Sequence, residues 1–217
     1  MKREKALGFA ARFPIPLVLA ACLLLVGCVP MKPPRTSFSD RVFRYQDQHG
    51  GFSVILPDQL QIIPTSAMGL DPLEVPLLAV SNHPWQFYGF GFAKKPLGTG
   101  REGFAKIADR FESRLEESIE AVKSSFGIHN LRFLNYRRTD FQGQPALYFE
   151  LSGTEVINHL SMPTHGSGMF FLRGNSGFCL AYMVVGDTLE EAEQLFRDMA
   201  AEREKTYNSF TPLDALQ

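Results

Sequence analysis

Between Thr99 and Gly127, apolar residues recur every three or four positions, which predicts one long amphipathic helix. Thr99 and Glu102 have the spacing of a capping box at its start, and Gly127 is a typical stop. The apolar positions are Phe104, Ile107, Ala108, Phe111, Leu115, Ile119, Val122 and Phe126. Because such a stripe is usually buried against a sheet, we expect the rest of the chain to supply strands.

Strand-like segments separated by turn residues make up most of the remaining sequence. They are residues 42–45, 52–56, 77–80, 87–92, 131–136, 146–151, 169–172 and 178–185. A second helix is predicted from Leu189 to about Tyr207, with Thr188 and Glu191 as its capping box. Strands joined by tight turns pair antiparallel, so we predict an α+β fold, a mainly antiparallel sheet with two long amphipathic helices packed on it.

The first 27 residues have the pattern of a secretory leader. Basic residues precede an apolar run from Ile15 to Val26, which is shorter than the about 20 residues that a membrane-spanning helix needs. The run ends in Leu25-Val26-Gly27-Cys28, which resembles the lipobox of bacterial lipoproteins. That resemblance implies cleavage between Gly27 and Cys28 and attachment of lipid to Cys28.

A second tetrapeptide, Leu19-Ala20-Ala21-Cys22, also fits the lipobox pattern. Cleavage there would leave a very short apolar region and would expose residues 23–26 on the mature chain, so we favour Cys28. Residues 28–40 contain three prolines and few core-forming side chains, which predicts a flexible, lipid-anchored tether. Residues 41–217 then form a single domain.

The anchor implies attachment to a membrane of the bacterial cell envelope. Val29 stands where an acidic residue would resemble an inner-membrane retention signal, so in a bacterium with two membranes we expect the outer one. Without the leader's four basic residues and one acidic residue, the mature chain has 18 basic and 22 acidic residues, a net charge of −4. This charge, with no basic stripe interleaved with aromatics, argues against nucleic acid as a partner.

Two histidines are weak candidates for a metal site. His159 and His165 lie in a segment, residues 159–168, that we predict to be a loop or the end of a hairpin. A zinc site needs three or four protein ligands, and no carboxylate or cysteine lies beside this pair. We therefore predict no metal and no other cofactor.

The tetrapeptide His165-Gly166-Ser167-Gly168 in the same predicted loop looks like a hydrolase oxyanion loop. An esterase of the common type would also need glycines two residues before and after the serine, and His165 and Met169 occupy those positions around Ser167. Cys179 lies in an apolar run, which predicts a buried, inert thiol. We therefore predict no catalytic residue and a protein that is not an enzyme.

The order of the elements resembles a known family. A hairpin whose second strand is Phe52–Pro57, a central helix, a meander and a last helix ending in Asn208-Ser209-Phe210 are similar to the PsbP/Mog1-like α/β/α sandwich, which DcrB-like bacterial lipoproteins share. The resemblance covers residues 42–212 and departs at Leu60, where many relatives carry Trp. It implies an accessory or binding role and transfers no catalytic residue.

Three hypotheses follow from these observations. The first is a non-catalytic, lipid-anchored protein that binds another component of the envelope. The second is a carrier of a small ligand, with the small residues Gly89, Gly91 and Ala93 of strand 87–93 lining a cleft. The third is a hydrolase or a metal-dependent enzyme that uses the 159–168 segment, which requires Ser167, or His159 and His165 together, to converge with an acidic residue in a pocket.

Overall fold

The structure is a computed structural model that describes residues 42–47, 51–68, 71–73, 75–82, 85–93, 100–117, 120, 128–157, 160–174 and 176–213. The strands are β1 (Val42–Gln46), β2 (Phe52–Pro57), β3 (Gln61–Ile62), β4 (Leu77–Asn82), β5 (Trp85–Ala93), β6 (Ile128–Phe141), β7 (Gln144–Ile157), β8 (Leu160–Arg173), β9 (Ser176–Val185) and β10 (Thr211–Pro212). The helices are η1 (Thr65–Met68), α3 (Gly100–Ser113), α5 (Leu189–Asp198) and α6 (Ala200–Ser209).

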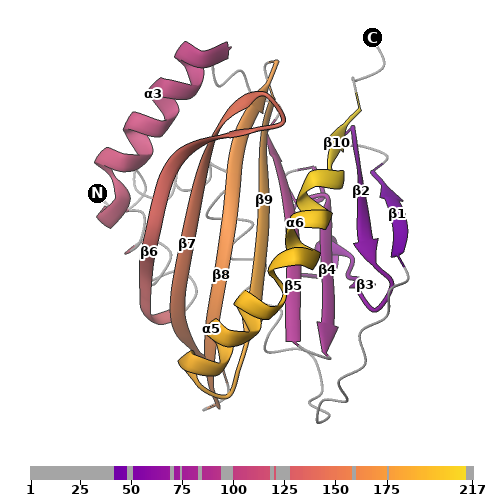
Figure 1. The fold of residues 1–217 in the computed structure, drawn as a ribbon, viewed down its shortest axis with the longest axis vertical. Coiled ribbons are helices and arrows are strands. Elements are labelled where there is room, and N and C mark those ends of the chain that lie inside the picture. Colours follow the sequence, from indigo (N-terminus) through magenta and orange to yellow (C-terminus); the bar gives the residue numbers. More distant parts are fainter. Residues whose placement is uncertain are drawn as a thin grey trace.

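A seven-stranded antiparallel sheet in the order β3-β4-β5-β9-β8-β7-β6 forms the centre of the domain, and a smaller sheet has the order β1-β2-β10. Figure 1 shows α5 and α6 crossing one side of the large sheet, with the small sheet beside α6. Helix α3 packs on β7 and β8 from the other side. The predicted α+β class and the two-sided helical packing are confirmed.

Alternation along the strands divides the core into two clusters, one on each side of the large sheet. On the side that we call the α3 face, Phe87 of β5 and Phe170 of β8 join Phe104 of α3. On the opposite side, the α5/α6 face, Tyr88 of β5 packs with Phe196 of α5. Because β4, β5, β7, β8 and β9 contribute to both clusters, the central part of the sheet is buried on both sides.

Both predicted helices are present, but with different limits. The capping box at the second helix is confirmed, because Thr188 Oγ1 accepts a hydrogen bond from the Glu191 amide at 3.1 Å. This helix changes direction at Met199, whose ψ of 6° separates α5 from α6. In the first helix, Phe104, Ile107 and Ala108 are buried as predicted, whereas Thr99 and residues 121–127 lie outside the described residues. Within the described part of the chain, no helix is long and apolar enough to cross a membrane.

The prediction of a loop or hairpin end at residues 159–168 is wrong for residues 160–168, and His159 lies outside the described residues. Residues 160–173 form strand β8, which pairs with β7 on one side and β9 on the other. The two glycines in this strand serve close packing, since a Cβ on Gly166 would lie 2.8 Å from the Tyr182 carbonyl oxygen. A Cβ on Gly168 would lie 2.0 Å from Cζ of Phe149. Glycines that looked like turn residues in the sequence are therefore required by neighbouring strands.

Candidate functional site

The structure places only some of the predicted site residues. Cys22, Gly27, Cys28 and His159 lie outside the described residues. His165 is on β8 and faces α5, because its ring centroid lies 4.4 Å from that of Phe196. Among the residues that the structure describes, no three His, Cys, Asp or Glu side chains are placed to hold a metal ion.

His165 meets an acidic residue, which is one part of what the third hypothesis required. Its Nε2 atom lies 2.8 Å from Oε1 of Glu150 on the neighbouring strand β7. An ionised carboxylate only accepts hydrogen bonds, so Nε2 carries the hydrogen in this pair. The Tyr148 hydroxyl donates to Oε2 of the same carboxylate at 3.3 Å, which holds Glu150 from both sides. The histidine side chain is 4% exposed, whereas that of Glu150 is 25% exposed and lies at the border of the helical cover.

Ser167 lies beside this pair but does not join it. It is the cross-strand partner of Glu150 and shares the α5/α6 face with His165, two residues away on β8. Its Oγ atom is buried and makes no hydrogen bond. Helix α6 covers the position, since the Tyr207 hydroxyl donates to the Ser167 carbonyl oxygen at 3.3 Å. The serine–histidine hydrogen bond of nucleophilic catalysis is thus not formed in this arrangement.

Arg203 of α6 packs on Phe196, the residue whose ring contacts His165. Its Nη1 donates to the Phe196 carbonyl oxygen at 2.9 Å, where the helix bends, and its Cζ lies 3.8 Å from the centroid of the Phe196 ring. Burial raises the pKa of Tyr182 and Tyr207 well above the ordinary value of a tyrosine, although the charge of Arg203 opposes the shift. Both phenols therefore stay neutral and donate hydrogen bonds between the helices and the sheet, Tyr182 to Gln86 and Tyr207 to the Ser167 carbonyl oxygen.

A second polar cluster lies under α6, farther along the sheet. The Tyr182 hydroxyl donates to Gln86 Oε1 at 3.1 Å, and Gln59 Nε2 donates to Glu202 Oε2 at 3.4 Å. The remaining buried polar atoms of this cluster, Gln59 Oε1, Gln86 Nε2, Tyr88 Oη and Glu202 Oε1, make no hydrogen bond. Burial raises the pKa of Glu202. These residues escaped the sequence analysis because they come from β5, β9, α6 and the turn after β2, which are distant in the chain, and form no local motif.

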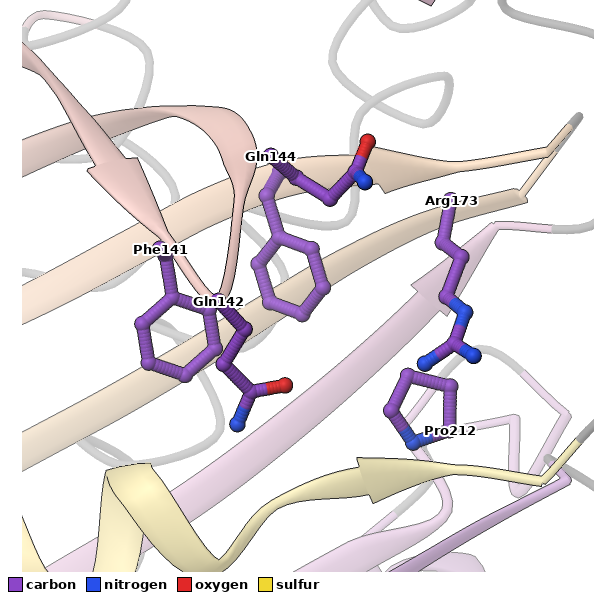
Figure 2. A pocket seen from close by; sticks show the side chains of 6 residues that line it. Phe141, Gln142, Gln144, Arg173 and Pro212 are labelled. Carbon is purple, nitrogen blue, oxygen red and sulfur yellow. The ribbon is translucent and has the colours of Figure 1, made fainter.

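A small pocket of about 190 Å³ opens at the turn between β6 and β7. Figure 2 shows Gln142 and Arg173 on opposite sides of the hollow, with Pro212 next to Arg173. Gln142 is held there because its Nε2 donates to the Phe210 carbonyl oxygen at 2.8 Å. The volume is below the about 300 Å³ at which ligand pockets begin, and the lining residues come from outside strand 87–93. This pocket does not provide the cleft that the carrier hypothesis expected.

Comparisons with known proteins address the fold. No protein-family model matches the chain, and neither does any curated protein. The solution structure of cyanobacterial PsbP (CyanoP) from Synechocystis aligns with a TM-score of 0.55 at 13% identity, over 85% of this chain and 98% of that one.

Two further solved structures show how far the likeness extends. A mutant of the protein Mog1 aligns with a TM-score of 0.50 at 10% identity, over 81% of this chain and 97% of that one. LpqN of Mycobacterium tuberculosis, described as involved in cell envelope biogenesis, aligns with a TM-score of 0.40 at 9% identity, over 80% and 93% of the two chains; a score this low supports no conclusion. The likeness to PsbP and Mog1 establishes that this chain has the PsbP/Mog1-like fold.

Proposed function

We propose that this protein is a lipid-anchored lipoprotein of the bacterial cell envelope, and that its PsbP/Mog1-like domain is a non-catalytic binding module for another envelope component. The observation that carries the proposal is the leader that ends in Leu25-Val26-Gly27-Cys28. A basic head, a short apolar run and a small residue before the cysteine occur together in the order that lipoprotein processing requires. The resemblance to the PsbP/Mog1-like family also favours an accessory role, although a fold alone does not define a function.

The position of the domain on its tether supports the proposal. The described fold begins at Val42 in β1, which is 14 positions after Cys28. A segment of that length reaches at most roughly 45 Å when extended, at about 3.3 Å per residue. An anchored domain could therefore contact both membrane-embedded proteins and components above the membrane surface.

The arrangement on β8 supports a binding role over the hydrolase alternative. The Ser167 hydroxyl is buried without a bond to His165, and α5 and α6 cover both residues. The imidazole instead contributes a charge-assisted bond to Glu150 and a ring contact to α5, which tie the helix to the sheet. These are the contacts of a structural polar cluster.

Fatty-acid labelling tests the anchor. Cells that express the full-length chain are fed an alkyne-tagged fatty acid, and the purified protein is examined for label and for its mature N-terminus by mass spectrometry. We expect label in the wild type and in Cys22→Ala, the matched control, and loss of both label and membrane association in Cys28→Ala. Label that survives Cys28→Ala, or an uncleaved and unlabelled chain in the aqueous fraction, would refute the proposal.

Formaldehyde crosslinking in intact cells tests the binding role. The anchored protein is recovered through a tag, and the copurified proteins are compared with those from a strain that expresses an unrelated lipoprotein at the same level. We expect a reproducible envelope partner that is specific to this chain. Repeated recovery of the anchored protein alone would contradict a binding role while leaving the anchor intact.

A further inference from the structure

Strand β6 ends the large sheet and pairs only with β7 among the strands that the structure describes. Figure 1 shows it as the outermost strand on the side opposite β4 and β3. The pairing with β7 is irregular between His129 and Arg132 and again between Phe133 and Asn135, but it is regular from Asn135 to Phe141. Bulges protect an edge against added strands, so the regular part is the segment that can accept one.

The arginines of β6 fall into two groups. Arg138 lies on the α3 face, where its guanidinium pairs with Asp109 and Glu112 of α3. Arg132 and Arg137 are exposed, and neither makes an ion pair within the described part of the chain. Helix α3 thus neutralises Arg138 and leaves Arg132 and Arg137 without an ion pair among the described residues.

The two remaining arginines lie on the same side of the strand. Arg132 is the cross-strand partner of Ser152, and Arg137 is that of Tyr148, which places both on the α5/α6 face. The Arg137 Cζ lies 4.6 Å from the centroid of the Tyr148 ring. Glu150, the cross-strand partner of Asn135 on β7, is already bonded to His165 and Tyr148. This side of the edge therefore carries excess positive charge.

Exposed apolar side chains accompany the charges. Leu134 is 49% exposed and Tyr136 is 42% exposed, and both belong to β6. Tyr136 pairs across the strands with Phe149 and so points to the α3 face. Arg and Tyr are enriched at the centres of protein interfaces, so this edge has the composition of a contact surface.

We propose that β6 is a docking edge for an extended acidic segment of the partner protein, which adds to the large sheet beside residues 135–141. This inference rests on the proposed binding function. Backbone groups of residues 135–141 would supply the hydrogen bonds of strand addition, a carboxylate of the segment would face Arg137, and acidic residues that extend past the added strand would reach Arg132. A second copy of this chain fits poorly, because antiparallel pairing of two β6 edges would bring their arginines together.

Site-specific photocrosslinking in cells that express the full, anchored chain tests this inference. A photoreactive residue replaces Asn135, which is exposed on β6, or, as a control position, Glu190, which is exposed on α5. We expect a protein adduct from position 135 only, and mass spectrometry of the adduct should locate the crosslink in a segment rich in Asp and Glu. The double variant R132E/R137E should reduce the adduct by about tenfold, because two attractions become repulsions.

Two controls separate the causes of a negative result. Arg197→Glu reverses an exposed charge on α5 and should leave the adduct unchanged, and fluorescence of Trp85 checks that each variant is folded. An adduct that contains phospholipid, that maps to a segment without acidic residues, or that is unaffected by R132E/R137E would overturn the docking edge. If formaldehyde still recovers a partner in that case, the proposed function stands and only the place of binding is wrong.

Discussion

Gly168 provides the sharpest test of the packing in this fold. It lies on β8 directly opposite Phe149 of β7, whose ring covers it. A Cβ at Gly168 would be 2.0 Å from Cζ and 2.5 Å from Cε2 of that ring. Carbon atoms pack at about 3.5–4.0 Å, so the ring would have to move by about 1.5 Å. It has little room to do so, because it is fully buried and in contact with the rings of Phe111 and Phe133.

These distances set the expected cost of Gly168→Ala. Overpacking in a core costs about 1–3 kcal/mol, and the severe overlap places this site at the upper end. Alanine also lowers the backbone entropy of the unfolded chain, which stabilises the folded state by about 0.5–1 kcal/mol. We therefore expect the free energy of unfolding to fall by about 2 kcal/mol. With a urea dependence of about 2 kcal/mol per molar, the unfolding midpoint should drop by about 1 M.

The assay is urea unfolding of the purified chain, followed by the fluorescence of its single tryptophan, Trp85, which lies 6.2 Å from the Phe87 ring. Gly143→Ala is the matched control, because its Cβ would meet no atom within 4 Å and only its φ of +76° is unfavourable, at about 1 kcal/mol. Phe149→Leu should make room for the added methyl group. If Gly168→Ala costs as much in the Phe149→Leu background as in the wild type, the clash with the ring is not the cause and the argument fails.

Three further predictions concern the helices and two ionisable groups. Thr188→Ala removes the acceptor for the Glu191 amide and should lower the free energy of unfolding by about 1 kcal/mol, measured by urea unfolding. Burial raises the pKa of Glu202, so the stability it contributes is full below the ordinary carboxyl pKa and is lost as the pH rises through its folded value. Glu202→Gln should therefore raise the urea midpoint at pH 7 and have less effect at pH 4; the reverse order would contradict this. Burial raises the pKa of Tyr45 to about 12, so stability should fall as the pH rises from 10 towards 12, and less steeply in Tyr45→Phe.

Local signals explain which parts of the fold could be predicted from the sequence. The hairpin of β1 and β2 joins two apolar runs that are close in the sequence, and the cap at Thr188 depends on one residue three positions away. The stripe of α3 is likewise contained in one segment. In each case the residues that determine the structure are neighbours in the chain, so a sequence window contains the whole cause.

Residues 169–172 of β8 were predicted as a strand, but residues 160–168 could not be found in this way, because the contacts that hold them in the sheet come from other strands. Pro163 speaks against a strand, yet it is tolerated because it lies at the end of the β8–β9 ladder, where Gly186 still donates to its carbonyl oxygen at 3.0 Å and only the reciprocal bond is lost. The bond between His165 and Glu150 joins residues 15 positions apart, and the cluster at Glu202 joins residues up to 143 apart. No spacing rule covers such distances.

The glycines show why the error about β8 also affected the functional hypothesis. Gly143 and Gly174 have positive φ and form turns, as glycines in a loop do. Gly166 and Gly168 have no positive φ and are small because Tyr182 and Phe149 press against them. Interpreted as a flexible loop, this segment would present Ser167 and His165 to a substrate. As a strand it places both beneath α5 and α6. The charged side chains that the sheet offers to a partner are therefore Arg132 and Arg137 at its β6 edge, which are exposed and make no ion pair among the described residues.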